Sequence, residues 1–358
     1  MKPYPPGKPI EEVQRELGLT SVVKLASNEN PLGPSPLAIE AIKAAANSVN
    51  IYPDASAWKL KQQLATKFGV SLDQVMIGAG SDEIIGVLGS IFLEEGSELL
   101  MGDPSFMRYD SAAHLNNAKL VKVPLNSEWR YDLTAIRASV SGDTRLVFIA
   151  NPNNPTGTTV TKTELESFLD SLPSHVTVVL DEAYYEFAAF DPEIPDGIEL
   201  VKAGRPVISL RTFSKAYGLA GLRVGYGFAD ASIVKAFDAA RPPFDVNSLA
   251  QAGASAALED QAHLRRGVEQ NARVKSELVE KMRSLGFETI PSHANFVCVN
   301  VRQPSMPVFE ALMRKGVIVR PGEALGMPNF LRVSVGTELE TKKFIDAFES
   351  VMLAAPTV

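Results

Sequence analysis

The stretch VISLRTFSKAYGLAGLRVGYG, Val207–Gly227, joins a short apolar run to a turn rich in hydroxyl and glycine residues. The apolar run predicts a buried strand, and the turn holds one lysine, Lys215, with an arginine, Arg223, eight positions later. Two earlier stretches repeat this order of apolar run and polar loop: LVFIA (146–150) before NPNNPTG (151–157), and VTVVL (176–180) before DEAYYEF (181–187). In an open parallel sheet, ligands bind at the carboxyl ends of the strands. The three stretches therefore predict a mostly parallel sheet with one shared site at its edge.

The composition is that of an ordinary soluble globular protein. A chain of 358 residues is long enough for two domains, or for one large α/β unit with an appendage. Its hydrophobic content of 45% is ordinary for a soluble globular protein. No apolar run approaches the roughly 20 residues that are needed to span a membrane. The net charge of −7 and the lack of a basic block argue against a nucleic-acid partner. The first residues lack the apolar core of a signal peptide, so we expect a cytoplasmic protein that binds neither membrane nor nucleic acid.

The cysteine and histidine content predicts no metal site. Cys298 is the only cysteine, which excludes an intramolecular disulfide and a cysteine-rich metal site. It lies in the apolar run FVCV, so we expect a buried structural thiol. The four histidines are scattered without the spacing of metal ligands.

The chain is expected to divide into three parts. Residues 1–35, rich in proline and polar groups, predict an N-terminal arm that packs with the small domain and the active site. Residues 36–243 predict a large α/β domain with a mostly parallel central sheet flanked by helices, and residues 244–358 a smaller α+β domain beyond Pro242-Pro243. Helices are expected at 10–17, 36–46, 58–68, 82–93, 248–257, 263–285 and 338–353, and strands at 75–77, 98–101, 120–123, 146–150, 176–180, 207–210, 296–300, 316–319 and 330–335.

The turn GAGSDE, 78–83, lies between an expected strand and an expected helix. A glycine turn that opens a helix presents free N–H groups and the positive end of the helix dipole, which favours a phosphate at Gly80 and Ser81. Glu83 stands where a dinucleotide-binding fingerprint has its third glycine, and an acidic first turn would repel a pyrophosphate. A nicotinamide dehydrogenase is therefore disfavoured. A single phosphate, with the carboxylates turned away, fits the turn.

Taken together, these motifs resemble a known family. NPNNPTG, DEAYYEF and TFSKAYGLAGLRVGY, in that order and each after a strand, are similar to the motifs of the fold type I pyridoxal-phosphate aminotransferases. Five further motifs narrow the resemblance to the histidinol-phosphate aminotransferase family: LASNENPLGPSP (25–36), IYPD (51–54), GAGSDE (78–83), RPPFDVNSLAQ (241–251) and FLRVSVGT (330–337). The resemblance implies pyridoxal phosphate as cofactor, an amino donor and a 2-oxo acid as substrates, and a homodimer whose active sites are shared between subunits.

The resemblance implies three catalytic residues. Lys215 matches the lysine that forms a Schiff base with the cofactor and then moves the proton to and from the substrate. Asp181 matches the carboxylate that pairs with the pyridinium nitrogen. Tyr184 and Asn154 match the pair that hydrogen-bonds the cofactor's phenolic oxygen, with the adjacent Tyr185 as an alternative to Tyr184.

Further cofactor and substrate contacts follow from the same resemblance. Phe106 matches the aromatic residue that stacks on the pyridine ring, where many relatives have tyrosine. Arg332 matches the arginine that binds the anionic group of the substrate. The residues implied for the cofactor phosphate are Gly80, Ser81, Thr212, Ser214, Arg223 and, from the neighbouring subunit, Tyr52; those implied for the substrate side are Arg332, Asn28, Asn30 and Tyr52. Arg320 is either a second anion contact or a surface charge at a strand end, and we favour the surface charge.

Several activities remain open on this scaffold. The first hypothesis is transamination between histidinol phosphate and 2-oxoglutarate. The alternatives are an aromatic amino-acid aminotransferase, an O-phosphothreonine decarboxylase and a regulator that keeps the cofactor but turns over little. A regulator of this kind usually carries an added module, and the motifs leave little chain for one.

Overall fold

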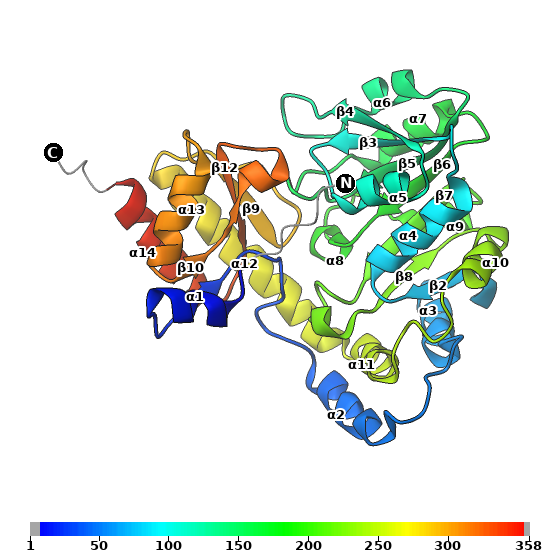
Figure 1. The fold of residues 1–358 in the computed structure, drawn as a ribbon, viewed down its shortest axis with the longest axis horizontal. Coiled ribbons are helices and arrows are strands. Elements are labelled where there is room, and N and C mark those ends of the chain that lie inside the picture. The colour runs from blue at the N-terminus through cyan, green and yellow to red at the C-terminus, as the bar shows by residue number, and fades with distance from the viewer. Residues whose placement is uncertain (1–7, 354–358) are drawn as a thin grey trace.

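The computed structural model describes residues 8–353, so the first seven residues of the predicted arm lie outside the described part. The structure has a large and a small domain, and the long helix α12 (Gln261–Ser284) runs from one to the other (Figure 1). Within residues 8–353, no helix combines the length and the apolar character needed to cross a membrane.

The large domain is built on a seven-stranded sheet in the order β2-β8-β7-β6-β5-β3-β4. All neighbouring pairs are parallel except those of β8, which runs antiparallel to both β2 and β7. The predicted mostly parallel α/β sheet is therefore confirmed. The strands are β2 (Val75–Gly78), β3 (Glu98–Asp103), β4 (Lys119–Pro124), β5 (Thr144–Ala150), β6 (Thr177–Asp181), β7 (Val207–Thr212) and β8 (Gly225–Phe228).

Helices cover both faces of this sheet, which is why its central strands are continuous apolar runs. In β5, Phe148 packs on one face with α4, α5 and α10, while Val147 and Ile149 pack on the other face with α6 and α7. Helices α2, α3, α9 and α11 cover the part of the sheet around β2 and β8. The helices of this domain are α2 (Pro36–Ala45), α3 (Trp58–Phe68), α4 (Ser81–Phe92), α5 (Arg108–Leu115), α6 (Leu133–Ser139), α7 (Lys162–Ser171), α8 (Tyr185–Ala188), α9 (Gly197–Lys202), α10 (Ala231–Ala240) and α11 (Ser248–Glu259).

The small domain packs a three-stranded antiparallel sheet, in the order β11-β12-β9, against helices α12, α13 and α14. The N-terminal arm joins it, because β1 (Val23–Lys24) pairs in parallel with β10 (Val317–Ile318). The remaining elements are α1 (Ile10–Leu17), β9 (Phe296–Asn300), α13 (Ser305–Arg314), β11 (Arg320–Pro321), β12 (Phe330–Ser334) and α14 (Glu338–Met352).

The packing of the helices after Pro242-Pro243 bears on the predicted boundary at that point. Helix α11 lies after this point, yet its residues Ala250, Ala254 and Leu258 belong to the same apolar core as β2 and β8. Farther along α12, Leu278 and Met282 belong to the core of the small domain. On this packing we propose that the boundary between the two cores falls within α12.

Candidate active site

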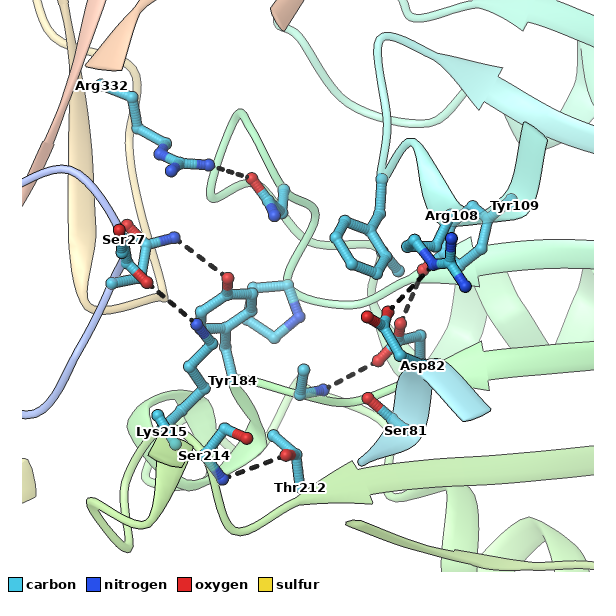
Figure 2. Close-up of a pocket in the computed structure, with 18 of the residues that line it drawn as sticks. Ser27, Ser81, Asp82, Arg108, Tyr109, Tyr184, Thr212, Ser214, Lys215 and Arg332 are labelled. Atoms are coloured by element: carbon cyan, nitrogen blue, oxygen red, sulfur yellow. Dashed lines mark hydrogen bonds and ion pairs between the residues drawn. The ribbon is translucent and has the colours of Figure 1, made fainter. Parts of the chain in front are cut away.

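A cavity of about 390 Å³ opens at the carboxyl ends of β5, β6 and β7. Arm residues and Arg332 of the small domain close its other side (Figure 2). The cavity thus brings together residues from the sheet, the arm and the small domain that are far apart in the sequence. Of the residues predicted for the site, the cavity is lined by Asn28, Ser81, Phe106, Asn154, Asp181, Tyr184, Thr212, Ser214, Lys215, Arg223 and Arg332.

Lys215 extends from the turn after β7 into this cavity (Figure 2). Its Nζ donates a hydrogen bond to the backbone carbonyl oxygen of Ser27, at 3.1 Å, and lies 5.7 Å from the ring centre of Tyr184. The arm therefore holds the amine beside the aromatic residue at the end of β6. None of the sequence motifs predicted that Ser27 would approach the lysine.

Asp181 ends β6 and is 4% exposed. Burial raises the pKa of its carboxyl to about 6, against hydrogen bonds from the hydroxyl of Tyr109 and the backbone N–H of Ala183 that favour the carboxylate. The Tyr109 hydroxyl lies 2.8 Å from Oδ2, and the Ala183 nitrogen 3.2 Å from Oδ1. A desolvated carboxylate of this kind is suited to a cationic partner inside the cavity, such as a protonated ring nitrogen.

Tyr109 is a site residue that the sequence motifs missed. Its side chain is fully buried in the first turn of α5, stacks on Phe148 with ring centres 4.4 Å apart, and meets Phe106 edge to face. The available signal was its position three residues after Phe106, at a spacing that brings both rings to one side of a helical turn.

The two adjacent tyrosines have separate surroundings. Tyr184 lines the cavity, and its hydroxyl oxygen accepts a hydrogen bond from Asn28 Nδ2 at 3.0 Å. The Tyr185 hydroxyl instead donates to Asp196 Oδ2 at 2.9 Å, and the centre of its ring lies 3.6 Å from the guanidinium carbon of Arg211. Of the two alternatives, Tyr184 is the one placed to reach a bound cofactor.

The predicted phosphate position is a tight cradle between α4 and β8. A Cβ on Gly80, whose φ is +86°, would lie 2.7 Å from Nη2 of Arg223, and one on Gly225 would lie 2.4 Å from the backbone nitrogen of Ser81. Glycine at both positions lets the strand approach the free N–H groups at the start of α4. An arginine and backbone donors around so small a space suit one terminal phosphate, so the residues present fit pyridoxal phosphate.

Thr212 and Ser214 are the two hydroxyl residues predicted to bind the phosphate from the turn after β7. Thr212 Oγ1 accepts a hydrogen bond from the backbone nitrogen of Ser214 at 3.0 Å. Ordinary turn bonding thus accounts for Thr212. Both residues line the cavity, as predicted.

The carboxylates of GAGSDE were expected to point away from a phosphate bound at Gly80 and Ser81, and the structure places the two differently. Glu83 turns back and accepts a hydrogen bond from the backbone nitrogen of Ala79 at 2.6 Å. Asp82 lines the cavity, where its Oδ1 lies 3.6 Å from Nε of Arg108 (Figure 2). The opposite charge of Arg108 explains why a second acidic residue is tolerated there.

Asn30, Tyr52 and Arg320 do not line the cavity, and Gly80 contributes only to the cradle beside it. Asn30 donates to the backbone carbonyl of Ala216 at 2.8 Å and accepts from the backbone of Leu32, which is a loop-stabilising role. Tyr52 is 79% exposed and does not line the cavity of its own chain. Arg320 is 6% exposed, so its prediction as a surface charge was wrong: it lies on β11 directly across from Arg332 on β12.

Arg332 and Asn28 build the substrate side from the small domain and the arm. Arg332 donates to Asn154 Oδ1 at 2.6 Å and to the carbonyl oxygen of Ala26 at 2.8 Å. The backbone nitrogen of Asn28 donates to Ser334 Oγ at 2.8 Å. A guanidinium held on β12 thus faces the loop after β5 across the cavity.

Comparisons with known proteins agree with this geometry. The chain is 47% identical over 352 residues to histidinol-phosphate aminotransferase 2 of Carboxydothermus hydrogenoformans, covering 98% of this chain and 97% of that one. It is also 47% identical to the histidinol-phosphate aminotransferase of Moorella thermoacetica, covering 98% and 91%. The crystal structure of histidinol-phosphate aminotransferase from Sinorhizobium meliloti in complex with pyridoxal-5'-phosphate superposes with a TM-score of 0.88, at 30% identity over 98% of this chain and 95% of that one.

An amine, a buried carboxylate and a single-phosphate cradle face one another at a sheet edge, as in the fold type I aminotransferases that use pyridoxal phosphate. The family model for aminotransferase class I and II matches residues 20–348. Within that class, the chain belongs to the histidinol-phosphate aminotransferase family.

Proposed function

We propose that the protein transfers the amino group of histidinol phosphate to 2-oxoglutarate, forming imidazole acetol phosphate and glutamate. The observation that carries this proposal is the 47% identity, over nearly the whole chain, to relatives named for that activity. The cavity supplies what the reaction needs: one cationic residue for an anionic substrate group and one amine for proton transfer.

The residues of the cavity have distinct roles in this proposal. When bound, pyridoxal phosphate supplies an electron sink for the substrate carbon that loses its proton. Lys215 holds the cofactor and then carries that proton, and its position beside Tyr184 directs it to one face of the site. Asp181 keeps the ring nitrogen protonated, and Tyr109 steadies the carboxylate for this task. Phe106 covers the ring.

Arg332 serves both half-reactions in the proposal. A guanidinium forms bidentate pairs with carboxylates and with phosphates, so one side chain can bind 2-oxoglutarate or glutamate and then the phosphate of histidinol phosphate. Its bonds to Asn154 and to the arm fix its orientation before the substrate arrives.

Separate half-reactions test the substrate. Histidinol phosphate, glutamate, phenylalanine and O-phosphothreonine are each added to purified protein while the visible band of the cofactor and the release of carbon dioxide are followed. We expect histidinol phosphate and glutamate to convert the cofactor rapidly to its amino form, without carbon dioxide. Fast conversion by phenylalanine but not by histidinol phosphate would instead establish an aromatic aminotransferase, and carbon dioxide from O-phosphothreonine a decarboxylase.

Borohydride reduction tests the role of Lys215. Reduction fixes a Schiff base permanently, so peptide mapping is expected to find the cofactor on the peptide that contains Lys215. Label on another lysine would refute the assignment.

We also propose a homodimer in which Tyr52 of each chain completes the phosphate site of the other. Tyr52 is presented at the surface: its ring stacks on that of Phe244 with centres 4.7 Å apart, and the preceding Ile51 is 64% exposed. An exposed aromatic and aliphatic group of this kind is a common signature of a protein interface. The cytoplasmic location expected from the sequence stays a prediction.

Mixing two inactive variants tests the shared site. Lys215→Ala lacks the amine and Tyr52→Ala lacks the aromatic group, so a mixed dimer holds one site with both defects and one intact site. An equal mixture that exchanges subunits is expected to recover about a quarter of the wild-type activity. No recovery, although subunit exchange is demonstrated, would show that Tyr52 acts in its own chain, and full activity of Tyr52→Ala alone would show that it has no role.

A further inference from the structure

Asp82 and Arg108 line the active-site cavity, and no role in the proposed function uses them. Asp82 lies in the first turn of α4, and Arg108 lies in the first turn of α5. The Oδ1 atom of Asp82 is 3.6 Å from Nε of Arg108, so the two side chains form an ion pair at the cavity wall (Figure 2). An ion pair at this place contributes to the electrostatic field inside the cavity.

Close packing of α4 against α5 holds this pair in place. A Cβ on Gly89 of α4 would lie 3.1 Å from Cβ of Ala112 on α5, so the two helices approach more closely than a larger residue at position 89 would allow. Ile85 and Leu88 of α4 belong to the same apolar core as Ala113 of α5. The first turns that carry the ion pair cannot separate without disturbing this core.

Helix α5 also contacts Asp181. The hydroxyl of Tyr109, the residue after Arg108, donates a hydrogen bond to Asp181 Oδ2 at 2.8 Å. Burial is the largest cause of the raised pKa of Asp181; the negative charge of Asp82 raises this pKa further, and the positive charge of Lys215 lowers it. Asp82 is therefore close enough to Asp181 for their like charges to repel.

The titratable groups that interact with Asp181 come from several elements of the large domain. They are Asp82 on α4, Tyr109 on α5, Tyr131 before α6, Tyr184 after β6 and Lys215 after β7. Lys215 is the cation among these groups, and in its proposed role the amine is bound to the cofactor. Arg108, in its ion pair with Asp82, is then the cation that offsets the charge of Asp82.

From this arrangement we propose that Arg108 is a positioning residue that acts through Asp82: it offsets the charge of that carboxylate and so keeps Asp181 charged for the ring nitrogen of the cofactor. The inference rests on the role of Asp181 in the proposed function and deepens it. Without Arg108, the repulsion between the two carboxylates would be uncompensated, and Asp181 would take up a proton more readily. A protonated Asp181 offers the ring nitrogen no negative charge.

The test measures the ionisation of Asp181 in the cofactor-free protein. Urea unfolding of each variant is compared with that of its Asp181→Asn counterpart between about pH 4.5 and about pH 8. Asparagine does not ionise, so the stability difference between the two proteins rises with pH and levels off above the pKa of Asp181 in the folded protein. The pH at which the difference levels off is the readout for Arg108.

In Arg108→Gln this pH is expected to rise by about half a unit, a modest shift because the two side chains are 37% and 38% exposed and solvent screens them. In Asp82→Asn it is expected to fall by about as much. The double variant lacks both charges and should return to within about 0.2 units of wild type. Arg108→Lys keeps the positive charge and should resemble wild type.

Arg314→Gln is the matched control, because Arg314 is an exposed arginine in the last turn of α13 and does not line the cavity. It is expected to leave the pH of levelling off unchanged. No rise in Arg108→Gln, or a rise that Asp82→Asn does not reverse in the double variant, would overturn the inference.

Cofactor affinity gives a second readout. Below about pH 6, pyridoxal phosphate is expected to bind Arg108→Gln up to about threefold more weakly than wild type, and at about pH 8, where Asp181 is charged in both proteins, equally well. An equal loss at both pH values would assign Arg108 to direct contact with the cofactor and overturn the inference. Failure of the half-reaction with histidinol phosphate would instead overturn the proposed substrate and leave these measurements unaffected, so the two failures are distinguishable.

Discussion

Replacing Asp181 with asparagine is expected to stabilise the cofactor-free protein while weakening its hold on the cofactor. Burial raises the pKa of this carboxyl from 3.8 to about 6, so the folded protein binds the proton more tightly than the unfolded chain does. Ionisation of Asp181 therefore costs stability. The cost is absent below about pH 4, grows between about pH 4 and 6 and is complete above that, where it amounts to about 3 kcal/mol.

Asparagine removes this cost but gives up part of the hydrogen bonding. One amide oxygen replaces two carboxylate oxygens that accept from Tyr109 and Ala183. The lost hydrogen bonding lowers the free energy of unfolding by about 1 kcal/mol. The net expectation at pH 8 is a cofactor-free variant more stable than wild type by about 2 kcal/mol. At pH 5 only about half of the ionisation cost applies to the wild type, so the stability difference between variant and wild type falls below about 1 kcal/mol.

Urea unfolding of the cofactor-free proteins at pH 5 and pH 8, at one protein concentration, measures this difference. Asp230→Asn serves as a control of opposite sign, because hydrogen bonds from Ser232 lower the pKa of Asp230 and its carboxylate stabilises the fold at pH 8. Cofactor added to Asp181→Asn is expected to raise the unfolding midpoint less than in wild type. A variant that is less stable than wild type at pH 8, or equally favoured at both pH values, would refute the reasoning.

Three further outcomes follow from the packing. The methyl group of Gly225→Ala would strike the start of α4, so this variant is expected to lose bound cofactor and thermal stability. In Gly86→Ala a Cβ meets no atom within 4 Å, so the free energy of unfolding in denaturant should rise by about 0.5–1 kcal/mol. Cys298 is fully buried and burial raises its pKa to about 12, so an aromatic disulfide reagent should modify it at least about 100-fold more slowly in the native than in the unfolded protein. Tyr109→Phe removes a hydrogen-bond donor to Asp181, so the pH midpoint of cofactor binding should rise by about one unit. An unchanged midpoint would argue against the hydrogen bond between Tyr109 and Asp181.

The strands were predictable where burial on both faces made them continuous apolar runs. The runs 146–150 and 207–210 both lie within strands of the sheet, at β5 and β7. Strand β8 was missed because its four residues, GYGF, include two glycines, which weaken any strand signal. Its glycines are there for packing: at Gly225 the strand passes so close to the phosphate cradle that no side chain fits. A tertiary contact thus removed the local pattern on which the prediction depends.

The candidate site was predictable to the extent that its residues follow strands. Lys215 and Asp181 were found because strand ends converge at one edge of the sheet, and Arg223 because it follows the lysine in the same turn. Tyr109 and Asp82 were not, since each lies in the first turn of a helix, where buried or acidic residues are common for structural reasons. Arg320 was misjudged because a charged residue at the end of a two-residue strand looks exposed until its partner strand is known.

The cofactor side and the substrate side of the cavity therefore depend on different levels of structure. The groups of the cofactor side lie at the carboxyl ends of strands of one sheet, so the sheet alone sets their relative positions. The substrate side joins the arm and the small domain. Asn28, in a left-handed backbone conformation with φ of 56°, bonds Ser334 on β12 through its backbone nitrogen and Tyr184 through its side chain. One arm residue thus ties the strand that carries Arg332 to the tyrosine beside Lys215. A change in how the domains pack would move Arg332 relative to Lys215, while leaving the cofactor cradle in place.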